Sequence, residues 1–355
     1  MSNSPAPLRV AVVGAGMMGA DHVSRITQRI SGAEVVAVVD PDTARATAAA
    51  ATAPGAKTYS AFEDALADAQ LDAVIIATPG FLHEPVILPA LEAGLAILSE
   101  KPLSETVESS LRIIEAEQKL DRPHIQVGFM RRFDKGYIEL RELVQSGANG
   151  ALLALHCAHR NPSTPPNYSE SALITDSVIH EIDTVPFIVG EPIVSVEVKK
   201  PRRNSLAPGG LLDPQFVLLE TVSGVLAIVE INVNVQFGYQ VTTDAVFESG
   251  VASIGRAETI QIATAGQIGQ GVTPSFKERF GAAYDVEVQR WVDAAHKGEI
   301  DGPSAWDGYL ASVVADAGVL AQQSGKKEPV TYALAKPAFY EFDRSSETTP
   351  SLATA

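Results

Sequence analysis

Two side chains in the second half of the chain, Asp176 and His180, are four residues apart, and Asp183 follows three residues later. On a helix this spacing places the three side chains on one face. A carboxylate beside an imidazole raises the basicity of the ring and fixes its tautomer, which a general base for alcohol oxidation requires. The same spacing also fits a helix that is capped by Asp176 and holds His180 as a hydrogen-bonded buried histidine.

A metal site is a further alternative for His180, with His156 or His159 as an additional ligand. These two histidines are three residues apart in a predicted strand, so their side chains point to opposite faces of the sheet. The chain has one cysteine, Cys157, and a small core residue on a strand is the simpler interpretation of it. We therefore expect no metal.

Lys101 stands between Glu100 and Pro102, at the end of a predicted strand. The proline restricts the backbone of Lys101 and so aims its side chain reproducibly. An ammonium at this place can donate a hydrogen bond to a substrate hydroxyl and stabilise the alkoxide that develops during oxidation. The alternative is a surface lysine paired with Glu100. Tyr239 either supplies a second hydroxyl donor or packs against a sheet.

The glycines Gly14, Gly16 and Gly19 have the spacing G-x-G-x-x-G and follow an apolar run at residues 8–13. The first glycine permits a tight turn, the second lets the backbone approach a pyrophosphate, and the third lets helix and strand pack closely. The helix that follows offers unpaired N–H groups and a partial positive charge to an anion. Together these features predict a dinucleotide-binding site.

Asp40 ends the next apolar run, about 20 residues after the last glycine, where a carboxylate can accept hydrogen bonds from a ribose diol. A 2′-phosphate about 4 Å from this carboxylate is disfavoured by several kcal/mol at an effective dielectric near 20. Hydrogen bonds to an unphosphorylated ribose contribute roughly 1.5–3 kcal/mol. No arginine follows directly, since the next residues are Pro41, Asp42 and Thr43. We therefore expect NAD as the cofactor, with NADP less favoured.

Strand and helix signals alternate from residue 8 to about residue 128, which predicts an α/β fold with a doubly wound parallel sheet. A capping box of Ser60 and Glu63 is expected to begin one of its helices. Ligands bind beyond the carboxyl ends of such strands, so Gly14, Asp40, Thr78 and Lys101 should line one crevice.

The second half has a different pattern, because its signals are mostly those of strands. They fall at residues 193–199, 216–222, 225–233, 240–248, 251–254 and 259–262, ahead of two helices at 274–296 and 304–323. This predicts an α+β domain with a mixed or antiparallel sheet. The expected organisation is a dinucleotide-binding domain at 1–128, a second domain at 129–343, and a disordered tail at 344–355.

Composition limits the possible partners. The formal net charge of −16 argues against nucleic acid and anionic membranes, and suits a neutral polyol substrate. No apolar run approaches the roughly 20 residues of a membrane span, and residues 1–7 lack the apolar segment of a signal peptide. One cysteine cannot form an internal disulfide, so we expect a cytoplasmic protein.

Taken together, these motifs resemble a known family over nearly the whole chain. The glycine triad, the Glu-Lys-Pro motif at 100–102, the segment at 128–134 and the Asp176/His180 pair resemble the glucose–fructose oxidoreductase/inositol dehydrogenase/rhizopine catabolism family. Within the family, residues 159–162, 175–183 and 237–239 are most similar to inositol 2-dehydrogenases.

The resemblance implies a Rossmann domain followed by a domain with a large open sheet, through which a homotetramer often forms. The implied activity is NAD-dependent oxidation of a secondary hydroxyl of a cyclic polyol, myo-inositol to inosose. The alternatives are the same chemistry on an aldose, a deoxy-inositol or an anhydro-sugar, or a regulator that senses NAD(P) without catalysis. The Lys101–Pro102 bond is implied to be cis, and Pro186 departs from the bulkier residues of relatives and is expected to affect the helix after His180.

The resemblance also implies roles for individual residues. The catalytic set is Lys101, Asp176 and His180. The substrate-binding residues are these three together with Arg131, Asn161, Asp183 and Tyr239. The cofactor-binding residues are Gly14, Gly16, Met17, Met18, Gly19, Asp40, Thr78, Pro79, His83, Glu100 and Lys101.

Overall fold

The structure is a computed structural model that describes residues 6–165, 167–256 and 261–341. The predicted disordered tail at 344–355 lies outside these residues, as does the first half of the strand predicted at 259–262. Among the described residues, no helix is both long enough and apolar enough to span a bilayer.

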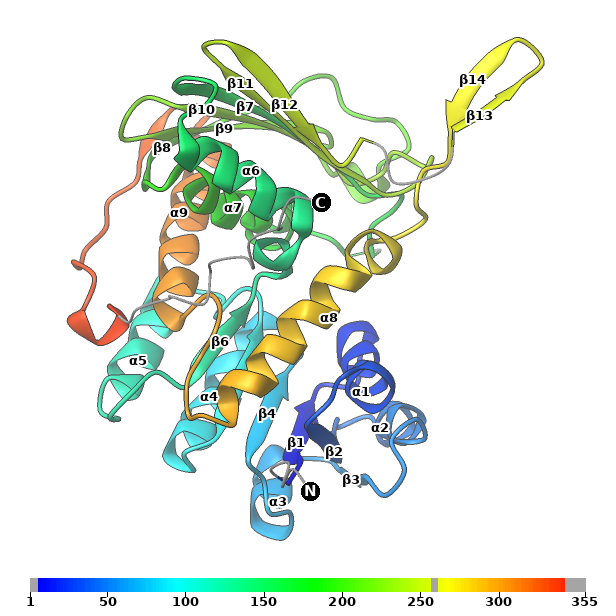
Figure 1. The fold of residues 1–355 in the computed structure, drawn as a ribbon, viewed down its shortest axis with the longest axis vertical. Helices are drawn as coiled ribbons and strands as arrows, with labels where there is room; N and C mark the ends of the chain where they lie inside the picture. The colour runs from blue at the N-terminus through cyan, green and yellow to red at the C-terminus, as the bar shows by residue number, and fades with distance from the viewer. Residues whose placement is uncertain (1–5, 166, 257–260, 342–355) are drawn as a thin grey trace, which may run out of the picture.

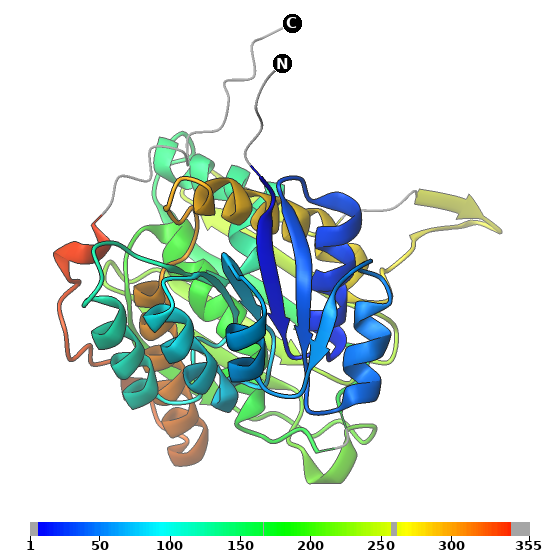
Figure 2. The same ribbon diagram turned by 90° about the horizontal axis from the view of Figure 1, so that it is seen from below.

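The first half of the chain forms a six-stranded parallel sheet in the order β3-β2-β1-β4-β5-β6 (Figure 2). This strand order confirms the predicted doubly wound sheet. The strands are β1 (Leu8–Val13), β2 (Ala33–Val39), β3 (Lys57–Tyr59), β4 (Ala73–Ile76), β5 (Ala96–Glu100) and β6 (Ile125–Gly128). The helices between them are α1 (Met17–Arg29), α2 (Thr43–Ala50), α3 (Phe62–Asp68), α4 (His83–Glu92) and α5 (Val107–Glu117).

The apolar runs form strands because both faces of this sheet are covered. Successive side chains of a strand point to opposite faces, and in β1 the side chains of Val10 and Val12 enter one apolar cluster while Ala11 and Val13 enter another. The first cluster includes residues of α1 and α2, and the second includes residues of α3, α4 and α5. The inner strands β1 and β4 are therefore buried from both sides over most of their length, as their largely apolar sequences predict.

The second half forms a seven-stranded sheet in the order β12-β11-β7-β10-β9-β8-β15, in which β7 and β10 are parallel and the other neighbours antiparallel. This confirms the predicted mixed sheet. Its strands are β7 (Leu152–Arg160), β8 (Ile193–Lys199), β9 (Gln215–Thr221), β10 (Leu226–Asn232), β11 (Gln240–Phe247), β12 (Gly250–Ile254) and β15 (Glu328–Pro329).

Helices cover one face of this second sheet (Figure 1). They are α6 (Lys135–Ser146), α7 (Ile179–Val189) and α9 (Ala305–Ser324). A π-helical turn, Leu173–Val178, leads directly into α7. A separate hairpin of β13 (Gln261–Thr264) and β14 (Gln267–Gln270) projects from the body of the molecule (Figures 1 and 2).

The helix α8 (Phe276–Ala295) returns from the second half to the first and lies beside α1 (Figure 1). Its residues Val288, Trp291 and Val292 belong to the apolar cluster that α1 and α2 form against the parallel sheet. One face of the first sheet is thus completed by a helix that is far away in the sequence. The boundary predicted after residue 128 remains a prediction.

One local expectation about a helix end differs from the structure. The predicted capping box is wrong, because α3 begins at Phe62 after Ala61 and no side chain caps it. The helix starts one residue later than predicted, so Ala61 takes the capping position in place of Ser60. A capping box does form at the start of α9, between Ser304 and Asp307.

Candidate active site

The glycine turn between β1 and α1 leaves no room for side chains at two positions. A Cβ at Gly19 would lie 1.7 Å from the carbonyl oxygen of Gly14, and a Cβ at Gly14 would lie 2.7 Å from the backbone of Ala77. Gly14 also has a φ of +92°, which L side chains rarely adopt. At Gly16 the space is open to 4 Å, on the side where a phosphate can approach the N-terminus of α1. This geometry fits a pyrophosphate.

Asp40 lies at the end of β2 with its carboxylate facing the glycine turn. It is 5% exposed, and its Oδ2 and Oδ1 accept hydrogen bonds of 2.8 Å from the backbone N–H groups of Ala15 and Asp42. Each oxygen retains a lone pair for a ribose hydroxyl. Arg45, on the first turn of α2, lies 3.3 Å from Asp40 Oδ1. Arg45 lies beyond the three residues that directly follow Asp40 in the chain, so the prediction of NAD did not take its guanidinium into account.

Of the other expected cofactor residues, His83 is placed differently from expectation. Its ring is fully buried, with one nitrogen 2.8 Å from the carbonyl oxygen of Thr78 and the other 2.8 Å from that of Pro102. Burial lowers the pKa of His83, and in its neutral form the ring can donate to only one of these two carbonyl oxygens. The ring therefore lies between the loop after β4, which contains Thr78, and the loop after β5, which contains Pro102. It has no exposed surface that a cofactor could contact.

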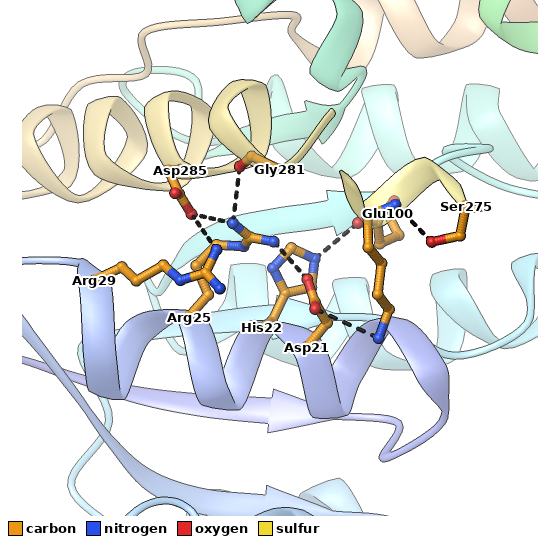
Figure 3. A network of polar contacts seen from close by, with 9 residues as sticks. Asp21, His22, Arg25, Arg29, Glu100, Ser275, Gly281 and Asp285 are labelled. Atoms are coloured by element: carbon orange, nitrogen blue, oxygen red, sulfur yellow. Dashed lines mark hydrogen bonds and ion pairs between the residues drawn. The ribbon is translucent and has the colours of Figure 1, made fainter. Parts of the chain in front are cut away.

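Glu100, at the end of β5, accepts a hydrogen bond of 2.8 Å from the buried ring of His22 in α1. Three residues further along the same helix, Arg25 donates to the carbonyl oxygen of Gly281 in α8 at 3.1 Å and pairs with Asp285 (Figure 3). This network holds together the glycine helix, the start of the Glu-Lys-Pro motif and α8. The loop that carries Lys101 is thus fixed to both halves of the molecule.

A cavity of about 370 Å³ lies between the two halves, next to the N-terminus of α1. Residues of the first half line one side of it, and the π-helical turn, α7, the loop after β7 and the start of α8 line the other. The lining residues expected from the sequence are Met17, Met18, Glu100, Lys101, Asn161, Asp176, His180 and Tyr239. Lys101 and His180, from separate halves, thus meet at one cavity.

The Lys101 ammonium lies 2.6 Å from Asp176 Oδ1 and 2.8 Å from the main-chain oxygen of Asp176. The Lys101 charge, against the effect of burial, lowers the pKa of Asp176. The sequence had indicated Asp176 as the partner of His180, whereas the carboxylate pairs with Lys101. A full positive charge attracts a carboxylate more strongly than a neutral imidazole does. The Lys101–Pro102 peptide bond is cis, as the resemblance implied.

His180 is 8% exposed, and its Nδ1 has no hydrogen-bond partner among the described residues. Burial, together with the positive charges of Lys101 and Arg131 and the ring of His159, holds the pKa of His180 well below its ordinary value. The ring is therefore neutral near pH 7 and able to accept a proton. Asn161 also lines this cavity, and its Oδ1 is likewise buried without a hydrogen-bond partner in the part of the chain that the structure describes.

Two residues expected near the substrate lie behind the cavity wall. Arg131 is 1% exposed and forms a buried ion pair with Glu181, whose pKa falls to about 2 because the charges of Arg131 and His159 outweigh the effect of burial. Asp183 pairs with Arg132 at 2.6 Å. Neither lines the cavity, because each has found a buried partner of opposite charge.

Tyr239 lies in the cavity wall with its ring edge toward His159, the two centroids being 6.3 Å apart. Burial raises the pKa of Tyr239 to about 12, so its hydroxyl remains a hydrogen-bond donor near pH 7. His159 is buried, whereas His156 is exposed on the opposite face of β7, as the strand period predicts. Among the described residues, no three histidine, cysteine, aspartate or glutamate side chains are grouped to hold a metal.

The strand order and the glycine turn at this cavity define a dinucleotide-binding domain of the Rossmann type. Residues 8–129 match an oxidoreductase family with an NAD-binding Rossmann fold, and residues 137–253 match the GFO/IDH/MocA C-terminal domain. The chain belongs to the glucose–fructose oxidoreductase/inositol dehydrogenase/rhizopine catabolism (GFO/IDH/MocA) family of oxidoreductases, which confirms the resemblance seen in the sequence.

Among its relatives is the inositol 2-dehydrogenase of Corynebacterium glutamicum (strain R), which is 56% identical over 94% of this chain and 98% of the relative. The structure of myo-inositol dehydrogenase from Lactobacillus casei in complex with NAD(H) and myo-inositol is similar, with a TM-score of 0.90. It is 36% identical and covers 94% of this chain and 100% of that one. The apo scyllo-inositol dehydrogenase of the same species has a TM-score of 0.84 at 26% identity, over 92% of this chain and 98% of that one.

Proposed function

We propose that this protein oxidises a secondary hydroxyl of a cyclic polyol with NAD, and that its substrate is myo-inositol, which becomes the 2-keto-inositol (inosose). The observation that carries the proposal is the meeting of Lys101 and His180 at one cavity between the two halves. His180, Asn161 and Tyr239 line this cavity and supply polar side chains for the hydroxyls of a polyol. The 56% identity to an inositol 2-dehydrogenase supports this substrate over other polyols.

In the proposed reaction His180 accepts the proton of the hydroxyl as its carbon is oxidised. The lowered pKa of His180 keeps the ring neutral and ready for this proton near pH 7. Lys101 donates a hydrogen bond to the same oxygen and stabilises its developing negative charge. Asp176 contributes by holding the Lys101 ammonium in place, through its carboxylate and its main-chain oxygen.

NAD, when bound, supplies the hydride acceptor. The residues of the glycine turn suit its pyrophosphate, and the free lone pairs of Asp40 suit the hydroxyls of its adenosine ribose. Glu100 and the methionines Met17 and Met18 line the part of the cavity nearest the glycine helix, where we propose the nicotinamide end lies.

The test is a panel of inositol isomers, deoxy-inositols, anhydro-sugars and aldoses, offered with NAD and then with NADP, with absorbance of the reduced nicotinamide as the readout. Myo-inositol with NAD should give the highest kcat/KM. A response to aldoses alone would support the same chemistry on another sugar. NADH binding measured by fluorescence, without turnover on any polyol, would support the sensing regulator and reject the enzyme.

We further propose a cytoplasmic protein that forms homotetramers through its second sheet and binds no nucleic acid. The face of that sheet opposite its helices carries the half-buried side chains of Phe216, Leu218 and Ile228, which a second copy would cover. Cys157 is buried and unpaired, so no disulfide is needed. The net charge of −16 disfavours nucleic acid. Light scattering in solution tests the tetramer.

A further inference from the structure

Tyr168 is a residue of the cavity wall for which no sequence motif predicted a role. It lies at the end of the loop that follows β7, and its ring packs against the main apolar cluster while its hydroxyl faces the π-helical turn. This loop also contributes Asn161 and Thr164 to the cavity wall. Backbone hydrogen bonds between Asn161 and the residues Asn232 and Val235 hold the start of the loop on the sheet.

The Tyr168 hydroxyl contacts the π-helical turn and the residue before it. It lies 3.1 Å from Asp176 Oδ2, 2.8 Å from the carbonyl oxygen of Ala172 and 2.8 Å from Ser177 Oγ. The hydroxyl has a single proton to donate, and a charged acceptor makes the stronger hydrogen bond. Ser177 can donate to the tyrosine oxygen, and the tyrosine proton is then shared between the Asp176 carboxylate, which is the charged acceptor, and the nearer carbonyl oxygen of Ala172.

The Asp176 carboxylate is therefore held from two sides. Lys101 contacts Oδ1 and Tyr168 contacts Oδ2, so the plane of the carboxylate is fixed by one partner from each half of the molecule. A carboxylate with a single partner can rotate, and the Lys101 ammonium would then move with it. Such π-helical turns occur often at functional sites, and this one presents Asp176 to both partners.

We propose that Tyr168 is a positioning residue for the reaction described above, on which this inference rests: its hydroxyl fixes the Asp176 carboxylate so that the Lys101 ammonium faces the substrate oxygen. The charged and titratable groups around this carboxylate are Lys101 from the loop after β5, Tyr168 from the loop after β7, and His159 from β7 itself. Tyr168 acts through Asp176 and Lys101.

Tyr168→Phe removes only the hydroxyl and keeps the ring. Because a hydrogen bond to a charged group is lost, kcat should fall about 10- to 100-fold. The hydrogen bond from Tyr168 also lowers the pKa of Asp176, so its loss should move the acidic limb of the rate profile to higher pH. NADH affinity should stay within about two-fold, because Tyr168 is remote from Asp40 and the glycine turn.

The matched control is Tyr332→Phe, which also loses a hydrogen-bonded hydroxyl, one that lies 2.8 Å from the carbonyl oxygen of Ile193 and outside the cavity. A merely structural role for Tyr168 predicts that both variants lose thermal stability while keeping wild-type kcat and pH profile. That outcome would overturn the inference.

A second measurement needs no substrate. The carboxyl carbon of Asp176, assigned by its absence in Asp176→Asn, can be titrated by carbon-13 NMR in the wild type and in Tyr168→Phe. We expect it to titrate at higher pH in the variant. Equal titration in the two proteins would reject the role of Tyr168 whatever the substrate is, whereas inactivity of the wild type on the whole polyol panel would reject the proposed function alone.

Discussion

The ammonium of Lys101 lies 2.6 Å from the carboxylate of Asp176 and 2.8 Å from its main-chain oxygen, although 75 residues separate the two in the chain. An ammonium has three donors, and Asp176 occupies two of them. The third is available to a substrate oxygen. The pair therefore joins the cofactor-binding half to the substrate-binding half at the point where the chemistry is proposed to occur.

Replacing Lys101 by Met should remove the donor that stabilises the alkoxide. We expect kcat to fall about 10²- to 10³-fold, as for the loss of an oxyanion donor in other enzymes. The control is Lys57→Met. Lys57 of β3 forms an exposed 2.8 Å ion pair with Asp68 of α3, and the loss of this pair should leave kcat unchanged. Steady-state kinetics with myo-inositol measures both, and near wild-type turnover of the Lys101 variant would contradict its role.

His180→Ala should lower kcat by roughly 10²- to 10⁴-fold, because it removes the general base. NADH binding, measured by fluorescence, should be almost unchanged. The exposed His156 on the opposite face of β7 provides the control variant His156→Ala, which should behave like the wild type. If His180→Ala keeps its turnover, another group accepts the proton.

The same histidine makes a prediction about pH. Because the pKa of His180 lies well below 6.5 in the folded protein, the ring stays neutral as pH falls through 6.5. The unfolded chain takes up a proton there, so this group makes the fold less stable as pH falls below 6.5. Urea unfolding should therefore show His180→Ala gaining stability relative to the wild type as pH falls from 7.5 to 5.5. An equal dependence in both proteins would show that His180 is not held neutral.

Arg45 bears on the choice between NAD and NADP, since it lies 3.3 Å from the carboxylate that should repel a 2′-phosphate. Asp40→Ser should weaken NADH binding about 10-fold or more through the lost hydrogen bonds. It should tighten NADPH binding, because the repelling carboxylate is gone and Arg45, which keeps its pair with Asp42, can turn its outer nitrogens to the phosphate. The double variant Asp40→Ser/Arg45→Ala should lose this gain in NADPH affinity. Fluorescence titration measures the NADPH affinity of both variants. Equal affinities would show that Arg45 does not bind the 2′-phosphate.

Glu117 of α5 is fully buried and accepts hydrogen bonds from the Tyr340 hydroxyl and from two backbone N–H groups, of His124 and Ile125. Burial nevertheless raises the pKa of Glu117 to about 7. The unfolded chain loses this proton near pH 4.5, so rising pH between 4.5 and 7 destabilises the fold, by up to about 3 kcal/mol.

Glu117→Gln cannot titrate and should therefore gain stability relative to the wild type as pH rises through this window. Urea unfolding at pH 5 and pH 8 measures the difference, with Glu115→Gln on the exposed side of the same helix as the control. A stability difference that is the same at both pH values would show that Glu117 is already ionised at pH 5.

Much of the fold follows from the sequence because burial on two faces leaves a simple signature. The largely apolar runs of β1, β2 and β4 predicted parallel strands, and the run predicted as a strand at 193–199 coincides with β8. The strand β14 (Gln267–Gln270) was not predicted, because its side chains are exposed and show no apolar period. The predicted start of α3 was wrong because a capping motif indicates which residues can cap a helix but does not determine where the helix begins.

For the site, the sequence indicated which groups matter but could not indicate their partners. The spacing of Asp176, His180 and Asp183 suggested one stripe, yet the long-range partners Lys101 and Arg132 take the two carboxylates. These pairings depend on loops and helices that come together only in the fold. No local sequence pattern predicted the π-helical turn at 173–178 or the contacts of the Tyr168 hydroxyl either.

The placement of α8 has a practical consequence for anyone who takes this molecule apart. Every residue proposed to hold NAD lies before position 102, yet Trp291 and its neighbours seal the sheet that carries them. An excised N-terminal half would expose the apolar side chains that Trp291 and its neighbours cover, and it should precipitate or bind other molecules nonspecifically. A chimaera that contains this cofactor-binding half will also need α8 to cover the same face of the sheet.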